Sequence, residues 1–245
     1  MDRNAICRLC QLLETSAGLH TTRNLTVSEQ VAIFLSVLAH QKKNCAVRHD
    51  FIRSSQTISK HFHSVLRAVL RLQPLLLPRP TPIGDECQDS RWRWFKIITI
   101  FVTNGYADSE GFLNPFHRVR YHFKEWNRGG GEPQTAHELF NLRHAAARNV
   151  IERSFELLKT RWGILRSPSY YSIDVQNRII VACCLLHNCV RLEMPEDPIE
   201  GELHEDPNNA ELGNTKYVSS IKTSTAWTAW REELATNMYA EWQRS

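Results

Sequence analysis

The chain has 245 residues, of which 42% are hydrophobic and 23% charged, and its net charge is +4. These values are typical of a soluble globular protein with one large or two small domains. No run of about 18 apolar residues occurs, which argues against a membrane-spanning helix. No membrane partner is expected. The N-terminal residues do not form a secretory signal, and the odd number of cysteines, seven, favours free thiols in a reducing compartment.

The charge is unevenly distributed along the chain. Residues 1–80 hold 11 Lys and Arg against 4 Asp and Glu, together with five His. Residues 193–213 hold eight Asp and Glu and no Lys or Arg. The basic N-terminal part favours a polyanionic partner such as nucleic acid. The acidic run is predicted to be a solvated linker, or else a tail that competes with that partner.

The N-terminal part is predicted to be helical. Met1–Ser16 has apolar residues on one face, and the Cys7-x-x-Cys10 pair within it is interpreted as packing, because no second pair at zinc spacing follows. Thr26–His40 begins with a capping box, in which Thr26 is the N-cap and Glu29 reaches back to it.

A short helix, a turn and a longer helix are predicted next, which is helix-turn-helix organisation. The helices are Cys45–Ile52 and Gln56–Leu72, with Ser55 as N-cap of the second. The second helix has a buried stripe of Ile58, Phe62, Val65, Leu66 and Val69. A separate row follows helical spacing and is made of Lys60, Ser64, Arg67 and Arg71. The pattern also fits a plain helical bundle with a solvated basic face, and by itself it slightly favours that alternative.

The middle of the chain changes character. Leu75–Asp89 is Pro-rich and is predicted to be a non-helical connector. Lys96–Val102 is β-branched and apolar, which predicts a buried strand. Gly111–Trp126 is irregular and aromatic.

Thr135–Leu165 is predicted to be helical, with a break near Asn141. Its apolar stripe is formed by Ile151, Phe155, Leu158 and Trp162. Glu152 lies on a neighbouring face, where most charged residues are solvated, and a pair with Arg148 is the ordinary expectation.

Two further helices are predicted towards the C-terminus. Val175–Leu192 is apolar and is expected to be a buried helix in which His187, near Cys183, Cys184 and Cys189, is a hydrogen-bonded core residue rather than a metal ligand. Residues 193–222 lack periodicity and are predicted to be mobile. Thr225–Trp242 has a Trp-rich face that should dock on the body of the protein or on a partner.

Several blocks together resemble plant PIF/Harbinger-type transposases and their domesticated, nuclease-like relatives. The blocks are SQTISKHFHSVLRAV, DSRWRWFK, GYADSEGFLNPFHRVRYHFKEW, RHAAARNVIERSFELLKTRWGILRSPSYYS, RIIVACCLLHN and the AWTAWREELA tail. The resemblance implies an RNase H-like DDE nuclease in which two Asp and one Glu hold two Mg²⁺ or Mn²⁺ ions. It identifies Glu152 as the third acid.

The chain departs from this family at the other two acids. Thr103 stands where the second Asp should be, and Asp108, past the turn, would point elsewhere. The segment that carries the first Asp is missing, because Lys96 runs almost directly into the strand of the second acid. That strand would thereby become an edge. A lone carboxylate binds Mg²⁺ weakly and cannot position two ions, so the resemblance predicts a remnant site.

The predicted fold is mainly α with a truncated α/β part: an N-terminal helix-turn-helix bundle and an incomplete RNase H-like DDE domain. The expected boundaries are 1–73 for the bundle, 74–95 for the connector, 96–192 for the truncated domain, 193–222 for the acidic linker and 223–245 for the C-terminal helix. Lys60, Arg67 and Arg71 are the candidate DNA contacts. The resemblance also implies a nuclear location, with a cytoplasmic one open, and a SANT-like or chromatin protein partner bound through the C-terminal helix.

Three interpretations follow from the sequence. The first is an active metal-dependent nuclease or transposase, which the ligand count disfavours. The second is a non-catalytic DNA or chromatin binder derived from a transposase. The third is a decayed element, or a gene model that skips an exon at Lys96–Ile97, in which case the encoded protein would be a normal DDE enzyme.

Overall fold

The computed structural model describes residues 1–77, 84, 87, 89, 92–95, 100–101, 109–121, 126, 131–167, 170–194, 196–202 and 224–244, with only the backbone at 44, 45, 100 and 101. This part of the chain is mainly helical, which confirms the predicted mainly α class. The helices are α1 (Arg3–Thr15), α2 (Val27–His40), α3 (Asn44–Phe51), α4 (Ser55–Arg71), α5 (Gln73–Leu76), α7 (Ala136–Arg161), η1 (Gly163–Leu165), α8 (Ile173–Glu193), α9 (Pro198–Glu202) and α10 (Thr225–Trp242). The strands are β1 (Ile100–Phe101) and β2 (Phe112–Leu113). None of the helices described is long and apolar enough to cross a membrane.

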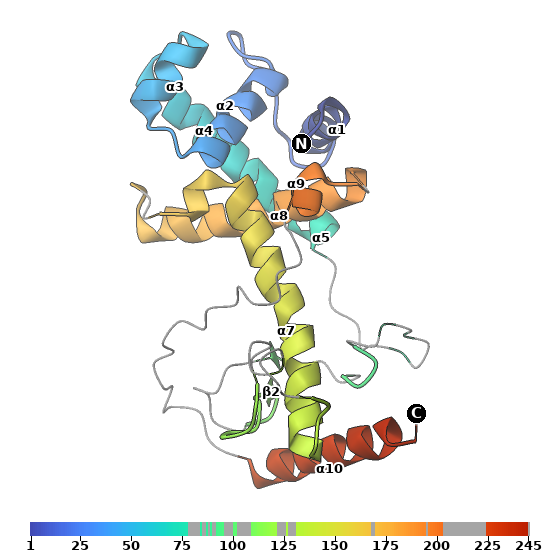
Figure 1. Ribbon diagram of the computed structural model, residues 1–245. Coiled ribbons are helices and arrows are strands. Elements are labelled where there is room, and N and C mark those ends of the chain that lie inside the picture. Colours follow the sequence, from blue (N-terminus) through green and yellow to red (C-terminus); the bar gives the residue numbers. More distant parts are fainter. Residues whose placement is uncertain are drawn as a thin grey trace. The chain divides into compact units, whose positions relative to one another are not determined.

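The chain forms two compact units (Figure 1). Unit 1 contains residues 1–79 and 154–204, and unit 2 contains residues 80–153 and 205–245. Helix α7 belongs to unit 2 up to residue 153 and to unit 1 from residue 154. The domain boundaries predicted above remain a prediction.

The core of unit 1 combines helices from both ends of that unit. Buried residues of α1, α2 and α4 pack in one cluster with Leu158 and Trp162 of α7, Ile164 of η1, and the inner face of α8. The α8 residues of this cluster are Ile179, Ala182, Cys183, Leu185, Leu186 and Cys189. The predicted α4 stripe of Ile58, Phe62, Val65, Leu66 and Val69 is fully buried here, which confirms that prediction.

The predicted helix starts are right to within one or two residues. Thr26 caps α2 as expected, since its Oγ1 accepts a hydrogen bond of 3.2 Å from the Glu29 backbone N–H. The second half of the box is wrong, because the Glu29 carboxylate instead accepts hydrogen bonds from Nε and Nη2 of Arg53, at 3.2 and 3.0 Å. The cap of α4 is Ser54 rather than Ser55. The side chain at the N-cap thus determines where a helix begins, whereas the longer Glu29 side chain bonds to a residue of another element.

A tight turn joins α3 to α4. Helix α3 ends at Phe51, and its C-cap residue Ile52 adopts a left-handed conformation with φ of 53° and is 88% exposed. Ser54 then accepts a hydrogen bond of 3.1 Å from the Thr57 backbone N–H and starts α4. Both helices pack against α2 (Figure 1).

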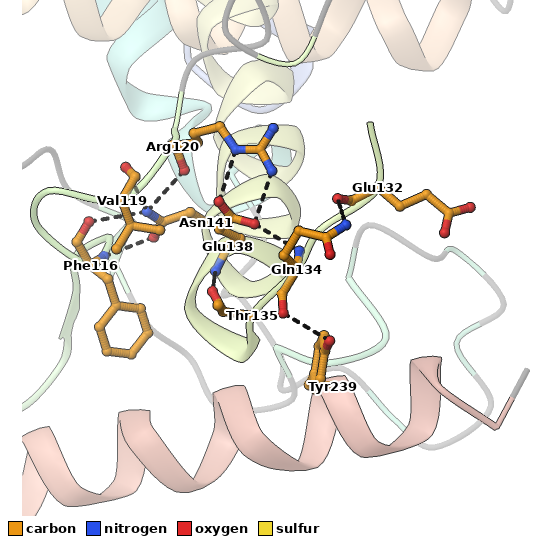
Figure 2. A network of polar contacts seen from close by, with 9 residues as sticks. All are labelled: Phe116, Val119, Arg120, Glu132, Gln134, Thr135, Glu138, Asn141 and Tyr239. Carbon is orange, nitrogen blue, oxygen red and sulfur yellow. Dashed lines mark hydrogen bonds and ion pairs between the residues drawn. The ribbon is translucent and has the colours of Figure 1, made fainter. Parts of the chain in front are cut away.

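Unit 2 is built on the first five turns of α7. Asn141 of this helix accepts a hydrogen bond from the Phe116 backbone N–H at 2.8 Å, and its amide donates to the backbone carbonyls of Phe116, Val119 and Arg120. Figure 2 shows how this side chain and Glu138 hold the 116–120 segment. Glu138 accepts two hydrogen bonds of 2.9 Å from Arg120, and this charge-assisted bonding lowers the pKa of its carboxyl.

Helix α10 docks on unit 2 with its apolar face. Ala235 and Met238 are buried in a cluster with Phe116, Phe140 and other residues of this unit. The indole N–H of Trp227 donates to the Phe112 carbonyl at 2.7 Å. The buried Arg231 donates to Asn114, and the Tyr239 hydroxyl donates to the Gln134 carbonyl, as Figure 2 shows for the latter. The sequence predicted that the apolar face of this helix docks on the body of the protein or on a partner, and in the structure it docks on the body.

Other predictions about helices and strands need correction. Helix α7 is continuous through Asn141, because that side chain bonds to a neighbouring segment instead of to its own backbone. Leu158 and Trp162 are buried as predicted, but Ile151 and Phe155 are 40% and 55% exposed. They lie between the stretches of α7 that the two hydrophobic clusters cover.

The segments around the predicted connector and linker are more ordered than expected. The prediction that Leu75–Asp89 is non-helical is wrong for its first two residues, which lie in helix α5 (Gln73–Leu76). Pro74 is in the first turn of this helix, where a missing N–H is tolerated. Strand β1 pairs in parallel with β2, so one of its edges is covered; the other residues of the predicted 96–102 strand lie outside the described part. Residues 196–202 of the predicted mobile linker dock on unit 1: Asp197 forms a buried ion pair with Arg161, and Glu200 pairs with Arg191.

Candidate functional site

Glu152 lies in the middle of α7, and its partner is a cation. Its Oε1 is 2.5 Å from Nη2 of Arg148, one helical turn earlier. The exposed fractions of the two side chains are 30% for Glu152 and 18% for Arg148. The ordinary expectation of an i, i+4 ion pair is thereby confirmed.

A chain of polar contacts continues from Arg148 into the core of unit 2. Arg148 hydrogen-bonds the hydroxyl of Tyr121, which also lies 3.1 Å from Nδ1 of His144. Nε2 of His144 is 2.9 Å from the Leu113 carbonyl, so this nitrogen carries the proton and Nδ1 accepts from Tyr121. Burial lowers the pKa of His144 to about 4 and raises the pKa of Tyr121. Both groups are therefore neutral at pH 7, and the network fixes the guanidinium that holds Glu152.

Among the residues that the structure describes, the surroundings of Glu152 do not fit a divalent metal. A metal site needs several oxygen ligands, whereas the guanidinium of Arg148 occupies this carboxylate and adds a positive charge that opposes a cation. Within the part of the chain that the structure describes, no group of three or more His, Cys, Asp or Glu could hold a metal ion. Thr103 and Asp108 lie outside the described residues.

The Cys and His residues of α8 belong to the core of unit 1. Cys183 and Cys189 are buried, and burial raises the pKa of both thiols, that of Cys189 to about 11. His187 is also buried, but among the described residues its Nδ1 has no hydrogen-bond partner, so the expectation of a hydrogen-bonded histidine is not met by this nitrogen there. Cys10 is buried in α1, which fits the packing interpretation, but Cys7 is exposed, so that interpretation is wrong for Cys7.

The predicted basic row lies on the outer face of α4. Lys60 and Arg67 are exposed and two turns apart, so they point to the same side of the helix. Arg71 is exposed too, but its Nη1 donates a hydrogen bond of 3.0 Å to the Ala17 carbonyl. Arg71 therefore anchors the segment after α1, and only Lys60 and Arg67 are left as candidate phosphate contacts from the predicted set.

Two residues that the sequence patterns missed extend this face. His63 of α4 is half-buried beside Tyr171, with the ring centroids 6.1 Å apart. Burial lowers the pKa of His63, and the positive charges of Arg67 and of Arg178 in α8 lower it further. Arg178 thus joins Arg67 from a helix more than 100 residues later, and no spacing rule within α4 could have found it.

Two segments of the chain match known protein families. Residues 81–188 match the family described as DDE superfamily endonuclease, and residues 1–71 match a domain of unknown function (DUF8040). The Bos taurus protein named "Putative nuclease HARBI1" is 35% identical over 83 residues, which cover 31% of this chain and 24% of that protein. The Homo sapiens protein of that name gives the same values, and the Mus musculus protein is 31% identical over 96 residues, or 36% of this chain and 26% of that protein. The matched part spans about a quarter of each relative's length, and no solved structure matches the chain significantly.

Proposed function

We propose that this chain, a Harbinger-type member of the DDE superfamily, is a transposase-derived, nuclease-like protein that binds DNA without cleaving it. The observation that carries the loss of catalysis is the ion pair between Glu152 and Arg148. In the two-metal chemistry of DDE enzymes the third acid is a metal ligand, next to two aspartates. Here its carboxylate is held by an arginine that Tyr121 and His144 fix in turn.

The departures in sequence support the same proposal. The segment with the first Asp is missing, and Thr103 replaces the second Asp. The exposure of Ile151 and Phe155 fits a loss of strands from an RNase H-like domain, because apolar residues at helical spacing normally have a covering surface.

DNA binding is proposed for α3 and α4 as a helix-turn-helix. The tight turn at Ile52 and the exposed Lys60 and Arg67 support it, since the second helix of this motif enters the major groove while its cations meet phosphates. A nuclear location follows from this proposal. For a SANT-like or chromatin partner we propose the outer, polar face of α10, because the inner face packs on unit 2.

The binding proposal is tested on the full chain with a fluorescein-labelled DNA duplex of mixed sequence. We expect the Lys60→Ala/Arg67→Ala variant to weaken binding and to reduce the slope of log K against log salt concentration by about 2. Arg3→Ala is the matched control, because Arg3 is an exposed arginine on α1. Equal slopes for the wild type and the double variant would contradict the proposal.

The alternative function is an active, metal-dependent endonuclease. This alternative is favoured if the natural transcript contains the missing segment. Transcript sequencing reads across the Lys96–Ile97 junction test this, since reads that include the missing strands would mean a normal DDE enzyme. For the present chain we expect no cleavage of plasmid DNA with Mg²⁺ or Mn²⁺. Cleavage that disappears in the Glu152→Ala variant would show that the enzyme is active.

A further inference from the structure

The start of α8 packs against the candidate DNA-binding helix. The ring of Tyr171, two residues before α8, stacks on Phe62 of α4 with centroids 5.0 Å apart and an interplanar angle of 11°. His63 meets the same ring edge-on. Figure 1 shows α8 crossing α4 within unit 1. The first turns of α8 are therefore held against α4 by aromatic contacts to the buried Phe62 and the half-buried His63.

Contacts on the preceding loop fix this arrangement further. The hydroxyl of Ser167 donates a hydrogen bond of 2.6 Å to the side-chain oxygen of Gln41, in the loop before α3. The ammonium group of Lys43 lies 4.7 Å from the centre of the Tyr170 ring, a cation–π distance. Tyr170 itself is 75% exposed. The start of α8 is thus tied both to α4 and to the segment that begins α3.

Cations from separate parts of the sequence gather at this place. Arg67 follows His63 by one turn of α4, and Arg178 lies in the second turn of α8, whose start packs on α4 through Tyr171. Both arginines are exposed. Burial lowers the pKa of His63, and the positive charges of the two arginines lower it further. An exposed guanidinium group forms strong, charge-assisted hydrogen bonds with phosphate oxygens. DNA phosphates are the anions that an exposed arginine pair beside a helix-turn-helix would meet.

We propose that the DNA-binding face continues from α4 onto the first turns of α8, with Arg178 contacting a backbone phosphate next to the one that Arg67 contacts. This inference rests on the DNA-binding function proposed above. It adds a DNA contact by Arg178, which lies in the segment that matches the DDE family. The α4 side chains would lie in the groove, and Arg178, on the neighbouring helix, would reach the phosphate backbone at the edge of that groove. Such contacts set the register of a protein on duplex DNA.

The test uses the full chain and the labelled duplex, with the binding constant measured over a range of salt concentrations. We expect Arg178→Ala to weaken binding severalfold and to reduce the salt slope by about 1, as Arg67→Ala does, because each removes one phosphate contact. Arg178→Lys should restore the slope, since an ammonium group also neutralises a phosphate. Arg3→Ala removes the same charge from α1 and should leave the slope unchanged.

The two proposals fail in distinguishable ways. If Arg178→Ala keeps the wild-type slope while Arg67→Ala loses about one unit, the extension onto α8 is wrong and binding by α4 stands. If neither variant changes the slope, both proposals are wrong. Circular dichroism of each variant confirms folding, which exposed positions such as Arg178 should not disturb.

Discussion

Replacing Gly163 by alanine should destabilise unit 1, because this glycine touches backbone from another helix. A Cβ atom built at Gly163 would lie 2.5 Å from the carbonyl oxygen of Ala39, at the end of α2. Real Cβ atoms essentially never come within 3.0 Å of such an atom, so η1 and α2 must separate by at least about 0.5 Å. Overpacking of this kind costs about 1–3 kcal/mol, against a gain of about 0.4–1 kcal/mol from the lower entropy of the unfolded chain. The net expectation is a loss of about 1–2 kcal/mol.

Urea unfolding followed by circular dichroism measures this loss. With a slope of about 2 kcal/mol per M, the midpoint should fall by about 0.5–1 M. Gly201→Ala is the matched control, because Gly201 lies in α9 with nothing within 4 Å of its built Cβ. The control should be neutral or stabilising, as alanine favours a helix. A Gly163→Ala midpoint equal to the wild type would refute the argued contact between η1 and α2.

Three further predictions concern other contacts. Arg71→Ala should cost about 1 kcal/mol of stability in urea unfolding, from the lost hydrogen bond to the segment after α1, and should leave the salt slope of DNA binding unchanged. Asp197→Ala should cost about 3–5 kcal/mol, because it leaves Arg161 buried and uncompensated, whereas Glu200→Ala removes an exposed pair and should cost at most about 1 kcal/mol. The pKa of His144 is about 4 in the folded protein, against an ordinary value of 6.5, so His144 takes up a proton on unfolding at any pH between these values. The free energy of unfolding should therefore fall as the pH drops from 6.5 to 4, by up to about 1.4 kcal/mol per pH unit. In the His144→Gln variant this fall should be less steep.

Local features of the fold were predictable from the sequence. The Thr26 cap, the buried stripe of α4 and the exposed Lys60 and Arg67 all follow from side-chain chemistry and helical spacing. The i, i+4 pair of Glu152 with Arg148 follows from the same spacing. These features need only neighbours within one helix or one cap, which explains why a single sequence contains them.

Other features depend on segments distant in the sequence, and no local pattern predicts them. The Glu29 carboxylate does not complete the capping box, because it forms an ion pair with Arg53 instead. Ile151 and Phe155 have helical apolar spacing and yet are exposed, because spacing defines a stripe but does not supply the surface that covers it. The acidic run 193–213 was predicted to be solvated because of its charge, but Asp197 forms a buried ion pair with Arg161. In each case the tertiary partner overrides the local expectation.

The boundary between the two matched families does not coincide with the boundary between the compact units. The DUF8040 match ends at residue 71 and the DDE match covers 81–188, yet residues 154–188 pack in unit 1 with the first helices. Cutting the chain after residue 79 would remove the α8 side chains from the core around Phe62 and Leu66, and each lost large apolar contact costs about 2–5 kcal/mol. That sum exceeds the stability of an ordinary domain, so an isolated N-terminal fragment should not fold. Loss of DNA binding in such a fragment would therefore reflect unfolding, and point variants of the full chain are the informative experiment.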